Sequence, residues 1–118
     1  INTLGAMGID NKTKRSTTGT LTSGLSGPAI RPIALKMVWQ VSQQLTIPIV
    51  GMGGITNTST ALEFIMAGAS AIAIGTANFT NPNIMVEIIK GLESYVQTMG
   101  LNHILDIRGQ LILNSNNP

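Results

Sequence analysis

Two short apolar runs, each ending in glycine, constrain the fold of this chain more than any other feature. The first, residues 47–55, reads Ile-Pro-Ile-Val-Gly-Met-Gly-Gly-Ile, and the second, residues 71–76, reads Ala-Ile-Ala-Ile-Gly-Thr. Continuous apolar character without alternation is typical of a strand buried on both faces of a parallel sheet. We therefore predict two buried strands, each followed by a glycine-rich turn.

Helical patterns accompany these runs. Residues 56–59 are rich in N-cap candidates, and Gly68 is predicted to end the helix that they begin. An earlier helix is predicted to open at Gly27 and Pro28. A later one is predicted to begin with Asn81 as its N-cap and to end at Gly100. The predicted apolar stripes are Ile30, Ala34, Met37, Val38, Val41 and Leu45 in the earlier helix, and Met85, Ile88, Ile89, Leu92, Val96 and Met99 in the later one.

Strands that alternate with helices indicate an α/β fold with a parallel sheet and right-handed crossovers. About three such units are predicted, starting at Ile1, Ile47 and Ala71. An open sheet of this size would leave unpaired edges, so we expect the chain to be a fragment of a larger barrel. A start at Ile1 rather than Met agrees with this expectation. The polar residues 10–24 are predicted to form a functional lid or a small hairpin after the first strand.

Composition excludes several classes of protein. With 118 residues, 43% apolar and 10% charged, the chain is unlike a disordered protein. It has no cysteine, which excludes disulfides, thiolate metal sites and a cysteine nucleophile in this segment. The net charge of +2 is small, and only Lys12, Lys14 and Arg15 cluster, so we expect no nucleic-acid partner. No apolar run approaches the roughly 20 residues of a membrane helix, so we expect no membrane contact.

The glycines after the two runs are the candidate binding residues. Gly51, Gly53 and Gly54 belong to the first run, and Gly75 and Thr76 to the second. Parallel strands of neighbouring units end at the same edge of the sheet, where glycine lets backbone amides approach an anion. A hydroxyl at Thr76 adds another donor. The pattern favours a phosphate site, although glycines that only form tight turns would give the same sequence.

Several motifs together resemble the dihydroorotate dehydrogenase family. Residues 49–57, followed by Ala61 and by Gly68-Ala69, resemble its C-terminal signature, and residues 23–29 resemble the segment before its sixth barrel helix. Residues 1–3 resemble its strand-end substrate motif. Residues 75–79, with Pro82, are most similar to class 1B, which uses NAD. The resemblance runs from Ile1 to about Arg108.

The resemblance implies a (β/α)8 TIM barrel with FMN that oxidises dihydroorotate to orotate in pyrimidine biosynthesis. It implies FMN contacts by Ile1, Gly27, Gly53, Gly54, Gly75 and Thr76, and substrate contacts by Asn2 and Thr3. It places the catalytic base, a cysteine, and a flavin-contacting lysine upstream, so no catalytic residue is assigned in this chain. Residues 1–109 would belong to the barrel and residues 110–118 to a polar tail.

The resemblance also implies a partner subunit that carries FAD and an iron–sulfur cluster and passes electrons to NAD, within a homo- or hetero-oligomer in the cytoplasm. Two alternatives stay open. One is another FMN-dependent barrel oxidoreductase, similar to dihydropyrimidine dehydrogenase or dihydrouridine synthase. The other is a non-redox phosphate-binding barrel or an inactive fragment.

The remaining polar candidates have simpler interpretations. We expect His103 to lie at the surface or cap a helix, Asn78 to serve a turn or cap, and Glu63 to lie on a solvated face. The basic cluster of Lys12, Lys14 and Arg15 is expected to solvate a hairpin tip. It would otherwise attract an anionic substrate or an electron-transfer partner.

Overall fold

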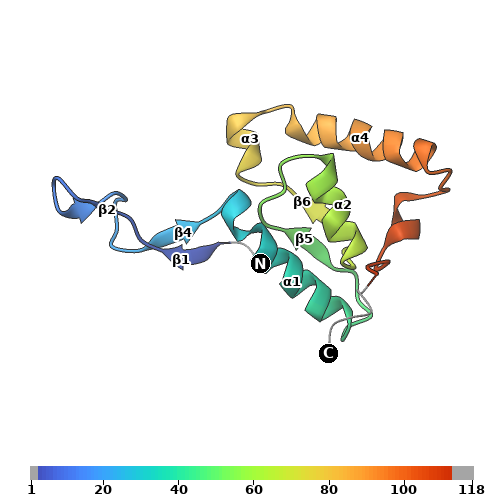
Figure 1. Ribbon diagram of the computed structural model, residues 1–118, viewed down its shortest axis with the longest axis horizontal. Coiled ribbons are helices and arrows are strands. Elements are labelled where there is room, and N and C mark those ends of the chain that lie inside the picture. Colours follow the sequence, from blue (N-terminus) through green and yellow to red (C-terminus); the bar gives the residue numbers. More distant parts are fainter. Residues whose placement is uncertain (1–2, 113–118) are drawn as a thin grey trace.

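A computed structural model of the chain describes residues 3–112 and consists of a helical body with a projecting arm (Figure 1). The arm holds the first four strands and the body holds the remaining elements. In chain order these are β1 (Leu4–Ala6), β2 (Ile9–Asp10), β3 (Arg15–Ser16), β4 (Ser23–Leu25), the 3-10 turn η1 (Pro28–Ile30), α1 (Arg31–Ser42), β5 (Val50–Met52), α2 (Thr58–Met66), β6 (Ala71–Ala73), α3 (Ala77–Thr80), α4 (Ile84–Thr98) and η2 (Ile104–Ile107).

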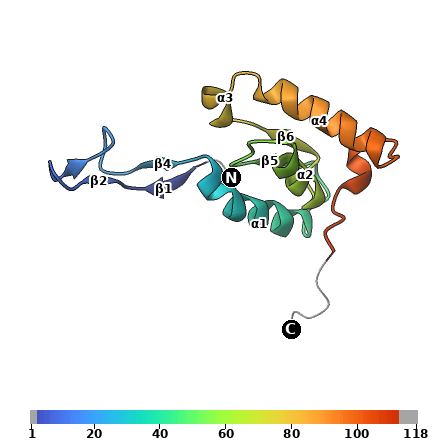
Figure 2. The same cartoon turned by 45° about the horizontal axis from the view of Figure 1, so that its top comes forward.

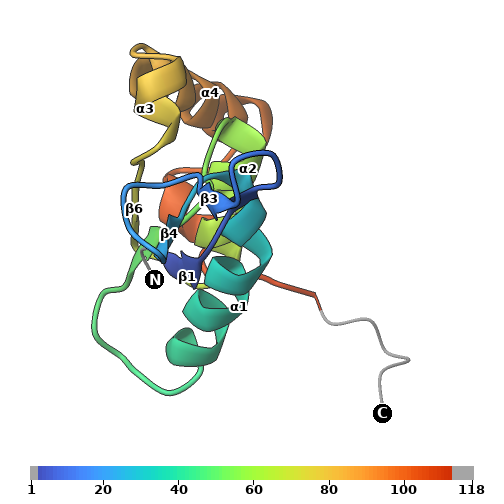
Figure 3. The same ribbon diagram turned by 90° about the vertical axis from the view of Figure 1, so that its left-hand side faces the viewer.

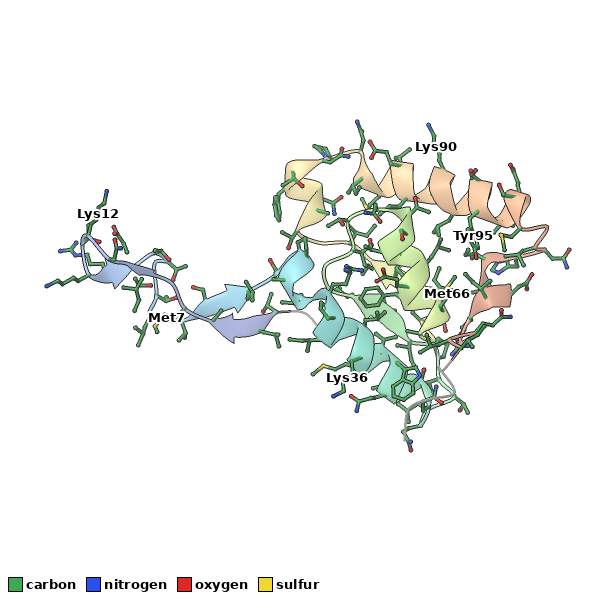
Figure 4. The ribbon with its side chains drawn as sticks, in the orientation of Figure 1. Met7, Lys12, Lys36, Met66, Lys90 and Tyr95 are labelled. Carbon is green, nitrogen blue, oxygen red and sulfur yellow. The ribbon has the colours of Figure 1, made fainter. Side chains whose placement is uncertain are left out.

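The arm is a long antiparallel hairpin. β1 pairs with β4, with Leu4 opposite Leu25, and β2 pairs with β3 nearer the tip. Figures 2 and 3 show the arm from two further directions, and Figure 4 places Lys12 at its tip and Met7 along its length. Lys14 has a left-handed backbone (φ 57°) in the turn. The prediction of a hairpin within residues 10–24 is confirmed.

The first predicted βα unit differs from expectation. Residues 1–2 lie outside the described part of the chain, and the strand that follows them, β1, belongs to the arm. Its partner is the antiparallel β4 and not the parallel sheet of the body. The described residues therefore contain two parallel βα units rather than three. After the hairpin tip the chain returns as β4 and pairs with β1, so β1 needs no long crossover connection to reach a partner.

The body is built on the parallel pair β5 and β6, with Val50 opposite Ala71 and Met52 opposite Ala73. α1 contacts β5, and α2 contacts β6, α1 and α4. Phe64 of α2 is fully buried at the centre of the core. A Cβ on Gly51 would stand 2.8 Å from the Phe64 ring, so glycine at this position allows helix and strand to approach. Gly51 thus serves packing rather than the predicted anion site.

Local caps fix the helix ends. The Asn57 side chain accepts from the Thr60 amide, and the Asn57 amide donates to the Thr60 hydroxyl oxygen, forming a capping box. Gly68 (φ 117°) and Gly100 (φ 63°) follow α2 and α4 as predicted. The N-cap of α4 is Asn83 rather than the predicted Asn81. Asn81 instead accepts from the Asn83 amide, so it orders the turn two residues earlier.

Burial is less complete than the sequence predicts. Val50 is 57% exposed, so β5 is not buried on both faces. Ile30, Ala34 and Val38 of the earlier predicted stripe are buried, whereas its other members, Met37, Val41 and Leu45, are at least 40% exposed. In the later predicted stripe, Ile88 is buried, whereas Met85, Ile89 and Met99 are exposed. The physical reason is geometric. Within residues 3–112, the two parallel strands and the three longer helices of the body cover only one side of β5 and of the helices α1 and α4.

No helix in the described part of the chain combines the length and the apolar character that a membrane crossing requires.

Candidate functional site

The parallel pairing of β5 and β6 brings two glycine turns to one edge of the sheet. Gly53 follows β5 directly, and Gly75 lies two residues after β6 ends at Ala73. Both turns, together with the segment before α1, line one cavity of about 220 Å³. Its walls are formed by Ser26, Gly27, Pro28, Ile30, Met52, Gly53, Gly54, Ile55, Thr56, Ala73, Gly75, Thr76, Ala77 and Thr80. The predicted meeting of Gly53 and Thr76 at one site is therefore confirmed.

Gly53 and Gly54 are required by both conformation and space. Their φ values are 129° and 72°, a region that other residues rarely adopt. A Cβ on Gly53 would stand 2.7 Å from the Ala34 Cβ, and a Cβ on Gly54 would stand 2.7 Å from the Gly27 carbonyl oxygen. The turn therefore lies against the start of α1 with no room for a side chain. The backbone of Gly53 and Gly54 is therefore accessible from the cavity.

Backbone amides supply the principal donors around this cavity. Within residues 3–112, the amides of Gly54, Gly75 and Thr76 donate no hydrogen bond to another protein group. Unpaired amides grouped in a concave site are suited to an anion, which can accept several of them at once. Among residues 3–112, no Lys, Arg, Asp or Glu belongs to the cavity wall. Recognition here therefore depends on neutral donors.

A hydroxyl bridge joins two walls of the cavity. Thr76 Oγ1 donates to Ser26 Oγ at 2.8 Å, connecting segments 50 residues apart in sequence. Ser26 precedes Gly27, which is buried and has φ 81°. The Thr80 hydroxyl is already used, because it donates to the Ala77 carbonyl of its own helix. Sequence reasoning did not select Ser26, although its position beside Gly27 and its hydroxyl were visible signals.

The charged groups near the site are engaged elsewhere. Arg31 begins α1 next to the Gly54 turn, and its guanidinium forms an ion pair with Glu63 of α2. Glu63 was predicted to lie on a solvated face; its side chain is 37% exposed, but it also pairs with Arg31, which was not predicted. The pattern of α2 alone could not reveal this pair, because packing of α1 against α2 brings the two charges together.

Other polar residues have structural roles. Asn78 donates its side-chain amide to the Ile74 and Gly75 carbonyls, and His103 accepts from the Leu105 amide at the start of η2. The predicted capping roles of both are confirmed. At the arm tip, the Lys12 amide and then the Thr13 hydroxyl donate to Asp10, and these bonds lower the pKa of its carboxyl group.

The predicted site residues are only partly brought together. Gly27, Gly53, Gly54, Gly75 and Thr76 all line the cavity. Thr3 does not: it is exposed and lies at the base of the arm, where a Cβ on Gly24 would stand 2.7 Å from its hydroxyl oxygen. Ile1 and Asn2 lie outside the described residues.

Comparison with known proteins identifies the family. The family model described as dihydroorotate dehydrogenase matches residues 1–96. The chain belongs to the dihydroorotate dehydrogenase family. The resemblance of the motifs is thereby confirmed.

Individual relatives agree. The dihydroorotate dehydrogenase B (NAD(+)), catalytic subunit, of Malacoplasma penetrans is 54% identical over 110 residues, which are 93% of this chain and 36% of that protein. The proteins of the same name from Thermodesulfovibrio yellowstonii and Bacteroides fragilis are 53% and 50% identical, over 92% and 94% of this chain and 36% and 37% of their own lengths. The chain thus spans just over a third of the curated relatives it matches.

Proposed function

We propose that this chain forms the phosphate-binding part of an FMN-dependent dihydroorotate dehydrogenase that is linked to NAD. The observation that supports the proposal most strongly is the meeting of the Gly53–Gly54 and Gly75–Thr76 turns at one cavity. It occurs in a chain of the dihydroorotate dehydrogenase family, at residues that the family resemblance assigns to FMN. The full reaction would oxidise dihydroorotate to orotate in pyrimidine biosynthesis.

The cavity residues fit a phosphate group. The amides of Gly54, Gly75 and Thr76 have no protein partner within residues 3–112 and can donate to its oxygens, while the Thr76 hydroxyl donates to Ser26. A side chain on Gly53 or Gly54 would collide with the start of α1, so the turn keeps its backbone open. The apolar residues Pro28, Ile30 and Met52 form the rest of the wall and suit the uncharged part of a cofactor. Gly27, in the segment before α1, would approach the flavin from the part of the wall that the two glycine turns do not form.

The role of this chain in the reaction is to bind and orient. FMN, when bound, supplies the chemistry that removes hydride from the substrate. The amides of both turns would hold its phosphate and thereby set the position of the cofactor. The backbone of Ile1 would contact the flavin, and Asn2 and Thr3 would bind the pyrimidine and its carboxylate. These assignments, like the upstream base, derive from the family resemblance.

We also propose that β5 and β6 belong to a (β/α)8 barrel. Val50 is 57% exposed, and the parallel pair has a free edge on each side within residues 3–112. Further parallel strands would pair these edges and cover the exposed face. Residues 1–109 would then be barrel, with residues 110–118 as its polar tail.

The partner proposal follows from the relatives' names. They are called catalytic subunits, which indicates a further subunit in those proteins. For this protein we propose a subunit with FAD and an iron–sulfur cluster that passes electrons to NAD, in a cytoplasmic hetero-oligomer.

The proposal is tested in the full-length protein. We expect it to purify with a yellow flavin that is released as FMN, and to oxidise dihydroorotate in preference to dihydrouracil. NAD reduction should require the partner subunit, whereas an artificial dye should accept electrons without it. A colourless protein that ignores added FMN would overturn the assignment. Preference for dihydrouracil would instead favour the dihydropyrimidine dehydrogenase-like alternative.

A further inference from the structure

We propose that Ser26 is an additional phosphate-binding residue, whose hydroxyl donates directly to the anion in the cavity. This inference rests on the proposed function for the identity of the anion. It assigns to Ser26 a role that the family resemblance did not give it.

The direction of the Ser26–Thr76 hydrogen bond is the first observation that supports the proposal. Thr76 Oγ1 is the donor and Ser26 Oγ the acceptor, at 2.8 Å. A serine hydroxyl has one hydrogen to donate in addition to its lone pairs. Ser26 donates that hydrogen to no group within residues 3–112, so it remains available to a ligand.

The position of Ser26 in the cavity is the second observation that supports the proposal. It lines the same cavity as the Gly53–Gly54 and Gly75–Thr76 turns, and its hydroxyl is bonded to one of these phosphate-binding residues. An anion that accepts from the amides of Gly75 and Thr76 is therefore within the neighbourhood of Ser26 Oγ. The hydrogen bond from Thr76 also polarises the Ser26 hydroxyl and strengthens it as a donor.

The uncharged wall of the cavity is the third observation that supports the proposal. Since no Lys or Arg of the described residues lines the wall, each neutral donor has a larger share of the binding. Thr80 has a hydroxyl on the same wall, but its hydrogen goes to the Ala77 carbonyl. Ser26 therefore differs from Thr80 by having a hydrogen to offer, and Thr80 provides a matched control.

The test compares FMN with riboflavin, which lacks the phosphate, in the full-length protein. Hydrogen bonds to a charged group contribute about 1.5–3 kcal/mol, so Ser26→Ala should weaken FMN binding by about tenfold or more. Its affinity for riboflavin should be unchanged. Thr80→Ala removes a hydroxyl of the same wall that has no hydrogen to offer, so any effect it has should be equal for FMN and riboflavin. Wild-type affinity for FMN in Ser26→Ala, or equal losses for FMN and riboflavin, would overturn the inference.

A second comparison separates direct contact from simple positioning of Thr76. In a Thr76→Val background, Ser26 has lost its hydroxyl partner but can still donate to phosphate. Direct contact predicts that Ser26→Ala weakens FMN binding further in that background, by at least about threefold. If Ser26 only positions Thr76, the substitution has no further effect there, and the inference fails.

The outcome is distinguishable from failure of the proposed function. If the wild-type protein does not bind FMN, the function is wrong, and inorganic phosphate becomes the probe. Phosphate binding, followed by ³¹P NMR, should still be weakened by Ser26→Ala. Equal phosphate binding in the wild type and in Ser26→Ala would overturn the inference on its own.

Discussion

Substitution of Gly54 by alanine should destabilise the protein by more than its backbone conformation alone explains. Gly54 has φ 72°, and a left-handed conformation costs a residue with a Cβ roughly 1–2 kcal/mol. The added Cβ would stand 2.7 Å from the Gly27 carbonyl oxygen and 2.8 Å from the Arg31 Cβ. The first contact is with backbone, which cannot rotate away as a side chain can. Overpacking of this kind costs about 1–3 kcal/mol.

The total expected loss for Gly54→Ala is therefore about 2–5 kcal/mol in the free energy of unfolding. Gly100→Ala is the matched control, because Gly100 has φ 63° but no atom within 4 Å of its added Cβ. It should show the conformational cost alone, about 1–2 kcal/mol. Gly75→Ala is a second control, with neither left-handed φ nor a close neighbour, and should change stability little.

The assay is urea unfolding of the full-length protein, followed by circular dichroism without added flavin, so that ligand binding does not contribute to stability. The reasoning is refuted if Gly54→Ala and Gly100→Ala lose the same free energy. That result would mean that the segment from Gly27 to Arg31 moves away at no cost, and that the close approach does not shape the cavity.

Three further predictions concern the core, a cap and the arm. Phe64→Ala should cost about 3–5 kcal/mol in urea unfolding, because the ring is fully buried; a loss below about 1 kcal/mol would contradict its central place in the core. Asn57→Ala should cost about 1 kcal/mol through the lost capping box, whereas Asn83→Ala, at an N-cap without a side-chain bond, should cost far less. Equal losses would argue against the capping box. The pKa of Asp10 is lowered in the folded chain, so its stabilisation of the tip is present above the ordinary carboxyl pKa and is lost as pH falls through the folded value. The protection of the Lys12 amide from exchange, relative to its intrinsic rate at each pH, should therefore fall in that acidic range, and Asp10→Asn should remove this change.

The sequence by itself determined the features that depend on near neighbours. The helix ends at Gly68 and Gly100 and the cap at Asn57 were predictable because each is formed by hydrogen bonds across a few residues. The two strands and the turns that follow them were predictable from apolar runs that end in glycine. Parallel pairing then followed from the alternation of strands with helices, and it was enough to place Gly53 and Thr76 at one site.

Only the tertiary structure decided which residues meet across the fold. Gly51 resembles the site glycines in sequence, yet it serves packing because the Phe64 ring of α2 lies against it. Glu63 pairs with Arg31 because α1 packs beside α2. Ser26 reaches Thr76 from 50 residues away because the segment before α1 closes over the ends of β5 and β6. Contacts of this kind depend on the relative placement of whole elements, which periodicity and local hydrogen bonding do not specify.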